Sequence, residues 1–328
     1  MLFLLLVSIL LSVPAIQTQL GKYVTNKLNE DYNTNISVKK IDLSLLGNVK
    51  LKEIEIRDHH KDTLIFVKRL TTSILSAKKV LENNIDLGSI SIDGAFVYMK
   101  TYKGETDDSM AVFIESFNDG SPTDSLAAPF KLSSSNVYVN DLNYRLINEN
   151  SKSPLTFSAT KTGGNLQDLL INGPDVSTNI RGLYFVDDRG LDITNFTTDF
   201  LYSLSEMHFE NSTIQTEKSN IKANINFTYN RDDFSDFNNK VNLKARFKNS
   251  TISSSDLKKF YNEISGNDLI KFKGLLKGKL NDFSLKNLDL KSKKGIKIVG
   301  DLNFKNAVNY EKGFVFKADL KDVTATYV

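Results

Sequence analysis

The sequence predicts a mostly β protein with a few short helices, preceded by an N-terminal transmembrane helix. Three observations predict this fold class. Apolar and polar residues alternate over most of the chain, turn-forming residues recur at short intervals, and no charge precedes Lys22. Alternation with a period of two is typical of a strand that is buried on one face and wet on the other.

Length and composition limit the classes of protein. The 328 residues suffice for one large or two ordinary domains. With 42 basic and 39 acidic residues the net charge is +3, so the chain lacks the basic patch of a nucleic-acid-binding protein. The absence of cysteine excludes disulfides and thiolate metal sites.

The first segment is apolar enough to span a membrane. A helix over residues 1–21 would be about 30 Å long, close to the hydrocarbon thickness of a bilayer. A cleaved signal peptide would begin with basic residues and end at a small-x-small site, so the segment favours a retained anchor over a cleaved one. The expected anchor residues are Leu2, Phe3, Leu4, Leu5, Leu6, Val7, Ile9, Leu10, Leu11 and Val13.

A helical apolar face continues beyond the anchor. Ile16, Leu20, Tyr23, Val24 and Leu28 share one face at helical spacing. This spacing predicts an amphipathic helix that leads into a folded domain. The missing basic flank before the apolar run predicts that the native chain starts upstream or that this chain is a fragment.

Alternation begins at Asn35 and is clearest in residues 221–229, 241–247 and 296–304. We count roughly twenty strand candidates with few long connections, which is typical of an antiparallel meander. The residues expected on the apolar strand face are Ile54, Ile56, Ile90, Ile92, Ile221, Ala223, Ile225, Phe227, Val241, Leu243, Phe247, Ile296, Ile298, Leu302 and Phe304. The Lys-rich stretch at residues 271–297 is interpreted as a solvated outer face, with contact to anionic headgroups as the alternative.

Turn signals separate the strand candidates. They lie at residues 58–62, 93–94, 172–174, 187–190, 293–295 and 311–313. Short helices are expected at Ser76–Asn84, Met110–Asn118 and Asp256–Ile264, of which the last has the clearest apolar stripe. The linker-like residues 120–129 suggest a first β unit at residues 22–118 and a second at residues 130–328.

The apolar face of the predicted sheet needs a cover, because an amphipathic sheet must bury one face. Three helices of about nine residues cannot cover so many strands. A sandwich of two sheets, a closed barrel and an open gutter filled by a ligand are the remaining solutions. Periodicity does not separate these solutions, and the sandwich is the default for a soluble protein.

A family resemblance favours the gutter. Residues 13–20 (VPAIQTQL), 36–44 (ISVKKIDLS), 49–58 (VKLKEIEIRD), 62–70 (DTLIFVKRL) and 90–97 (ISIDGAFV) follow one another in an ordered pattern. Together they resemble the start of TamB-family proteins, the inner-membrane subunits of the translocation and assembly module, which belong to the AsmA-like group. The pattern is not a catalytic signature. Beyond Gly104 only the general β pattern agrees.

The resemblance implies a single-pass inner-membrane protein of a diderm bacterium, with its bulk in the periplasm. It implies an elongated antiparallel β-groove that conducts phospholipid or another acyl-chain lipid and supports outer-membrane biogenesis. The family contacts a BamA-like outer-membrane protein through a C-terminal region that is absent here, so we expect a truncated C-terminus. The alternative function is that of a secreted or surface β-sandwich or solenoid, acting as a scaffold or adhesin.

No catalytic, metal or cofactor site is expected from the motifs. His59 and His60 lie in a polar turn beside Asp58 and Asp62. Neighbouring side chains on an extended turn usually diverge, and the sequence reveals no third ligand, so a solvated turn is expected rather than a metal site. The chain is therefore not expected to be an enzyme.

Overall fold

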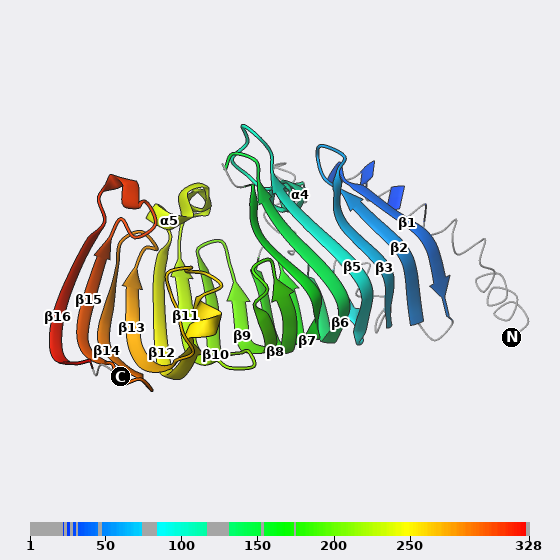
Figure 1. The fold of residues 1–328 in the computed structure, drawn as a ribbon. Helices are drawn as coiled ribbons and strands as arrows, with labels where there is room; N and C mark the ends of the chain where they lie inside the picture. The colour runs from blue at the N-terminus through cyan, green and yellow to red at the C-terminus, as the bar shows by residue number, and fades with distance from the viewer. Residues whose placement is uncertain are drawn as a thin grey trace, which may run out of the picture. The chain divides into compact units, whose positions relative to one another are not determined.

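The computed structural model describes residues 22, 25–26, 29–30, 32–44, 48–73, 84–116, 131–151, 154–173 and 175–325. In these residues the chain is mostly β, and its strands form one open sheet of 16 strands (Figure 1). The predicted fold class is confirmed at this level.

Several expectations lie outside the described residues. They concern the anchor at residues 1–21, the apolar face of the amphipathic helix, the linker at residues 120–129 and nearly all of the helix expected at Ser76–Asn84. Within the described part, no helix combines the length and the apolar character needed to cross a membrane.

The described residues belong to two compact units. Unit 1 comprises residues 1–173 with 185–188, and unit 2 comprises residues 174–184 with 189–328. The division expected between residues 118 and 130 stays a prediction, because most of that segment is outside the described residues.

Unit 1 is a sheet in the order β1-β2-β3-β5-β6-β7 (Figure 1). The short β4 pairs with β6. Its elements are β1 (Asn35–Leu43), β2 (Asn48–Arg57), β3 (Thr63–Ser73), β4 (Asn84–Leu87), β5 (Ile90–Thr101), α4 (Ser109–Glu115), β6 (Lys131–Asn148) and β7 (Leu155–Asn172). The next strand, β8 (Asp175–Asp187), contributes residues to both units.

The expected antiparallel meander is wrong at one step. Both β4 and β5 pair with β6 in parallel. Parallel neighbours need a crossover instead of a tight turn, and the connection between β5 and β6 contains α4. The other pairings with a determined register are antiparallel.

Helix α4 lies where a helix was expected over Met110–Asn118. It begins at Ser109, because the side chain of Asp108 accepts hydrogen bonds from the backbone N–H groups of Met110 and Ala111. An aspartate in this position satisfies N–H groups that have no partner inside the helix.

Unit 2 continues the sheet in chain order from β8 to β16. Its further elements are β9 (Asp192–Tyr202), β10 (Glu206–Gln215), β11 (Asn220–Thr228), η1 (Arg231–Asp236), α5 (Phe237–Lys240), β12 (Asn242–Ser253), α6 (Ser254–Leu257), β13 (Leu269–Gly278), β14 (Phe283–Ser292), β15 (Lys297–Lys305), η2 (Tyr310–Lys312) and β16 (Val315–Thr324).

The helix expected at Asp256–Ile264 is wrong in extent. Only α6, a single turn at Ser254–Leu257, forms there, and Phe260 and Tyr261 beyond it are 47% and 60% exposed. A short helix is marginal unless its apolar face is buried. The Asp256 carboxylate instead accepts a hydrogen bond from the hydroxyl of Thr216 at 2.6 Å.

Most of the expected turns connect strands, but the turn expected at residues 93–94 is wrong. Asp93 and Gly94 lie inside β5, which pairs with β3 and β6 on both sides of them. Gly94 adopts a φ of +67°, which a glycine tolerates without strain. The glycine therefore marks an irregularity within a strand.

Similar irregularities recur in the middle of other strands. In β10 the register with both neighbours shifts between Phe209 and Thr213, around Asn211 with its φ of 52°. In β14 the shift surrounds Asn287, also at 52°. Such β-bulges add one residue to a strand, bend it and increase its twist. The extra residue also interrupts the alternation, so that Phe209 and Ser212 point to the same face.

Buried hydroxyl groups complete the hydrogen bonds at the bulges. Ser212 donates to Thr198 Oγ1 at 2.9 Å, and Thr198 donates to the carbonyl of Glu210 at 2.9 Å. Ser250 accepts from the backbone N–H of Lys222 at 3.0 Å. Thr198, Ser212 and Ser250 are at most 2% exposed. Their hydroxyls supply partners to buried backbone groups that the disturbed ladder would leave unpaired.

Replacing Asn287 by valine is expected to lower the free energy of unfolding by about 1–2 kcal/mol, because a β-branched residue resists the left-handed conformation. Urea unfolding measures the change. The matched control is Asn303→Val in the regular part of β15, which is expected to stay within about 0.5 kcal/mol of the wild type. Equal losses in both variants would contradict a conformational requirement at the bulge.

Candidate functional site

The candidate functional site is an apolar face that each unit presents on its sheet. Residues directly opposite each other on neighbouring strands point to the same face, with their Cβ atoms about 5 Å apart. The strand register therefore shows which side chains lie next to each other across neighbouring strands within each unit.

One row of apolar residues crosses unit 2 from β9 to β16, and we call it row 1. Every neighbouring pair in it is a direct cross-strand partner. Row 1 consists of Phe200, Phe209, Ile225, Ala245, Leu276, Leu285, Leu302 and Ala318. No polar side chain interrupts the row over eight consecutive strands.

A second row runs beside the first and is rich in aromatic rings. Row 2 consists of Tyr202, Met207, Phe227, Leu243, Gly278, Phe283, Phe304 and Phe316. The rings of Phe283 and Phe304 stack with centroids 4.6 Å apart, and Phe316 lies 5.2 Å from Phe304. The two rows lie two residues apart along each strand and hence on the same face.

Unit 1 has an apolar face of the same kind. Val38, Ile54, Val67, Ala95 and Leu142 are successive cross-strand partners from β1 to β6. Ile54, Val67 and Ala95 form a buried hydrophobic cluster of this unit, at 9%, 8% and 2% exposure. This cluster is thus a strip along one face of the sheet.

The structure places most of the expected apolar-face residues on these faces. Ile54, Ile56 and Ile92 lie on rows of unit 1. In unit 2, Ile225, Phe227, Leu243, Leu302 and Phe304 belong to rows 1 and 2. The other expected residues that lie within strands on these faces are Ile90, Ile221, Ala223, Phe247 and Ile298.

Two expected residues lie just outside the strands. Val241 precedes β12 and is buried at 2% exposure, with its N–H donating to the carbonyl of Phe237. Ile296 precedes β15 and is 43% exposed. For all of these residues, contact with lipid stays a prediction.

The opposite face of unit 2 is charged. Lys244 lies opposite Lys277, and Lys271 lies opposite Lys291. Like charges directly across a strand pair are destabilising unless water screens them, and all four lysines are exposed. Ion pairs such as Lys286–Asp301 at 3.1 Å also lie on this face. The exposure agrees with the interpretation of residues 271–297 as a solvated face.

The apolar faces are only partly covered by the described residues. All described strands belong to one hydrogen-bonded sheet, and the longest described helix, α4, has 7 residues. On β16, Phe316, Leu320 and Val323 are 50%, 43% and 55% exposed. Most residues of rows 1 and 2 are half-buried, unlike the core of a sandwich, in which the second sheet excludes water.

The arrangement can bind an elongated apolar ligand. Rows 1 and 2 offer aliphatic and aromatic side chains along a continuous line, and they present no charged group. Such a surface suits apolar groups such as acyl chains.

The sequence did not reveal the bulges or the buried hydroxyls of Thr198, Ser212 and Ser250. The available signal was a break in the alternation at an asparagine or glycine, as at Asn211 and Gly300. These residue types tolerate positive φ and mark bulges inside strands.

No protein-family model matches the chain, and no curated protein matches it either.

The charged face also holds one of the bulges. Asp199 Oδ1 accepts a hydrogen bond from Arg181 Nη2 at 2.7 Å, and Asp199 Oδ2 accepts one from Asn211 Nδ2 at 3.0 Å. The hydrogen bonds from Asn211 and Arg181 lower the pKa of Asp199 below its ordinary value. The ionised carboxylate is therefore favoured in the folded state over the unfolded state.

A lowered carboxyl pKa adds stability above the ordinary pKa, and this stability is lost as the pH falls through the folded-state pKa. We expect the wild-type free energy of unfolding to fall below about pH 4, and to fall less steeply in Asp199→Asn. Urea unfolding at several pH values measures both slopes. Identical slopes would show that Asp199 does not contribute.

Proposed function

We propose that this protein binds the acyl chains of phospholipid on its apolar sheet faces and conducts them along the sheet. The observation that supports this function is the unbroken row 1. Most of its residues are half-buried, and no opposing sheet covers it among the described residues. The proposal requires neither a catalytic residue nor a cofactor.

Hydrophobic energetics favour a lipid on these faces. Soluble proteins rarely expose apolar patches beyond about 300–600 Å². Burial of a methylene group contributes about 0.8 kcal/mol, so a sixteen-carbon chain gains on the order of 10 kcal/mol. At about 4.8 Å per strand, the eight residues of row 1 span about 34 Å, comparable with the ~30 Å of hydrocarbon in a bilayer.

Conduction also requires that no position hold the lipid too tightly. Movement along a series of sites is favoured when each site binds well enough to be entered and weakly enough to be left. Neighbouring positions of row 1 carry similar aliphatic or aromatic groups. An acyl chain that slides by one strand therefore exchanges one apolar contact for another.

The N-terminal resemblance supplies the cellular setting of the proposal. The blocks at residues 13–20 and 90–97 resemble TamB-family proteins, which form elongated β-grooves. We accordingly propose a single-pass anchor in the inner membrane, a groove in the periplasm, and transfer of phospholipid toward the outer membrane with a BamA-like partner. The apolar face of each unit would line such a groove.

A charge on the apolar face is expected to weaken lipid binding with little effect on folding. Leu302 lies in row 1 between Leu285 and Ala318, so Leu302→Asp puts a carboxylate on the path of the acyl chain. We expect at least tenfold less phospholipid to co-purify with the variant. Native mass spectrometry of the full chain, released from detergent micelles, measures the bound lipid.

The matched control is Asn303→Asp, which places the same charge one residue along, on the opposite face beside Lys317. It is expected to retain the wild-type amount of lipid. Circular dichroism verifies that both variants fold. Unfolding of Leu302→Asp would instead indicate a closed core, and equal lipid in both variants would contradict the proposed face.

Site-specific photocrosslinking in cells tests the same face. A benzophenone amino acid replacing Phe304 in row 2 is expected to crosslink to phospholipid. The same group at Lys305, whose side chain is exposed on the other face, is expected to crosslink only weakly. Phosphate analysis of the purified adducts measures the ratio, and crosslinking that favours Lys305 would exclude the proposed face.

A further inference from the structure

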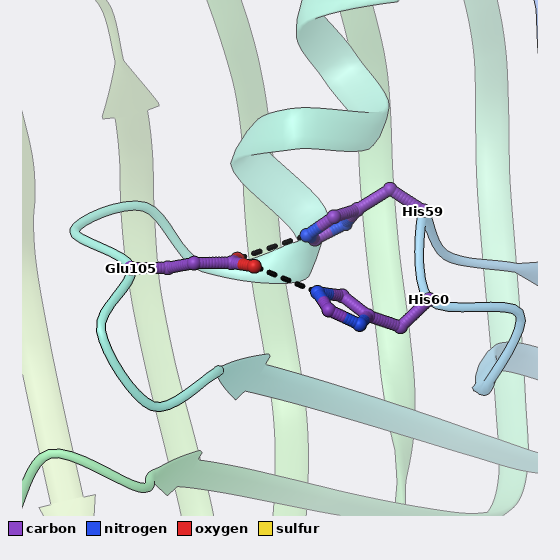
Figure 2. A group of neighbouring side chains, drawn as sticks. All are labelled: His59, His60 and Glu105. Carbon is purple, nitrogen blue, oxygen red and sulfur yellow. Dashed lines mark hydrogen bonds and ion pairs between the residues drawn. The ribbon is translucent and has the colours of Figure 1, made fainter.

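The turn between β2 and β3 and the loop after β5 bring three side chains of unit 1 together at the surface (Figure 2). His59 Nε2 lies 2.9 Å from Glu105 Oε2, and His60 Nε2 lies 2.6 Å from Glu105 Oε1. One candidate ligand atom from each residue lies within 4.8 Å of the other two. Glu105 is the third candidate ligand, which the sequence did not reveal, 45 residues from His60.

The turn that carries the two imidazoles is held in shape by Asp58. Its Oδ1 atom accepts hydrogen bonds from the backbone N–H groups of His60 and Asp62, both at 2.9 Å. Lys61 adopts a φ of 68°, which tightens the turn. Asp58 itself is 6% exposed. The tightness of this turn explains why neighbouring histidines converge here instead of diverging.

Tyr102 orients the imidazole rings. The ring of His60 stacks on that of Tyr102 with centroids 3.8 Å apart, and the ring of His59 meets it edge-on at 5.5 Å. The Tyr102 hydroxyl lies 2.7 Å from Asp58 Oδ2. Burial and the neighbouring carboxylates raise the pKa of Tyr102, so the hydroxyl remains a donor.

The loop that carries Glu105 is fixed independently. The N–H of Glu105 donates to the carbonyl of Tyr102 at 3.0 Å. Asn150, in the turn after β6, donates to the carbonyl of Glu105 at 2.9 Å and accepts from the N–H of Gly104 at 2.8 Å. The carboxylate and the two imidazoles therefore meet at a point determined by three separate connections of the sheet.

The geometry is close to that of a metal site. Zinc binds histidine nitrogen and carboxylate oxygen at about 2.0–2.2 Å, which places tetrahedral ligands roughly 3.3 Å apart. The present N···O distances need to widen by less than about 1 Å to reach that value. The side chains of His59, His60 and Glu105 are 29%, 45% and 34% exposed, so they can make this adjustment, and an ion can enter from solvent.

We propose that His59, His60 and Glu105 bind one divalent transition-metal ion, with Zn²⁺ as the reference ion. Two imidazoles and one carboxylate suit zinc and its neighbours, whereas Ca²⁺ and Mg²⁺ prefer all-oxygen sites. Water completes the coordination. The ion links the β2–β3 turn to the loop after β5 and so joins the ends of three strands of unit 1.

The competing account is a hydrogen-bonded cluster without metal. The hydrogen bonds from His60 and His59 lower the pKa of Glu105, and they use the same atoms that would bind the ion. Metal binding must therefore break these hydrogen bonds, which makes the two accounts distinguishable by titration with the metal alone.

The experiment is a calorimetric titration of ZnCl₂ into the full chain in detergent micelles at about pH 7.5. The protein carries no histidine tag and is first treated with a chelator. We expect one ion per chain with a dissociation constant in the micromolar range or below. Glu105→Gln and His60→Gln are each expected to weaken binding at least tenfold, and His59→Gln/His60→Gln to abolish it.

His208 provides a matched control, because it is the remaining histidine of the three in the chain. Its Nε2 atom lies 2.9 Å from Glu206 Oε2 in unit 2. His208→Gln is expected to leave the zinc affinity unchanged. Circular dichroism confirms the folding of each variant, and histidine NMR signals are expected to shift for two residues and not for the third.

Two results would overturn the proposal. One is the absence of saturable binding up to about 1 mM Zn²⁺. The other is a folded Glu105→Gln variant with wild-type affinity, which would show that the ion binds elsewhere. Neither result bears on lipid binding, because the test uses no lipid readout and the cluster lies outside the apolar rows.

Discussion

The register between strands is the constraint on which the rest of this structure depends. An apolar residue on one strand contributes to a continuous apolar face only if its direct partners on both neighbouring strands are also apolar and point to the same side. In row 1 this condition is met across eight strands. A shift of one residue would turn the polar residues of a strand, such as Lys244 or Asp301, onto the apolar face. The bulges at Asn211 and Asn287 preserve this condition along the strands, because they let residues before and after the bend share one side.

The sequence predicted what depends on local periodicity. The strand class, most turns and the apolar positions of residues 221–227 follow from alternation, which is a property of consecutive residues. The helix expected at Asp256–Ile264 failed because its stripe remains exposed, and burial is a tertiary property. The parallel pairing of β5 with β6 and the placement of Gly94 inside a strand were missed for the same reason, since both depend on partners far along the chain.

The two candidate sites differ in how well they can be predicted from the sequence. The lipid-binding face consists of many similar positions, so a pattern identifies it even when single residues such as Ile296 fall outside the strands. The histidine cluster consists of three residues with one candidate ligand atom each. Its third member, Glu105, comes from another connection of the sheet. Adjacent histidines alone indicated a solvated turn. Only Glu105, which the tertiary structure brings close to both imidazoles, makes the two histidines a candidate metal site.

The parallel step between β5 and β6 also affects how unit 1 reaches its fold. Most other neighbouring strands are joined by connections of a few residues, such as those between β2 and β3 and between β13 and β14, and can pair soon after both are made. The pairing of β5 with β6 brings together residues such as Asp93 and Asn140, which are 47 positions apart. Closing a long loop costs entropy before any contact forms, and non-local pairing slows folding. We therefore expect the pairing of β5 with β6 to form late in the folding of unit 1, after the meander of β1, β2 and β3.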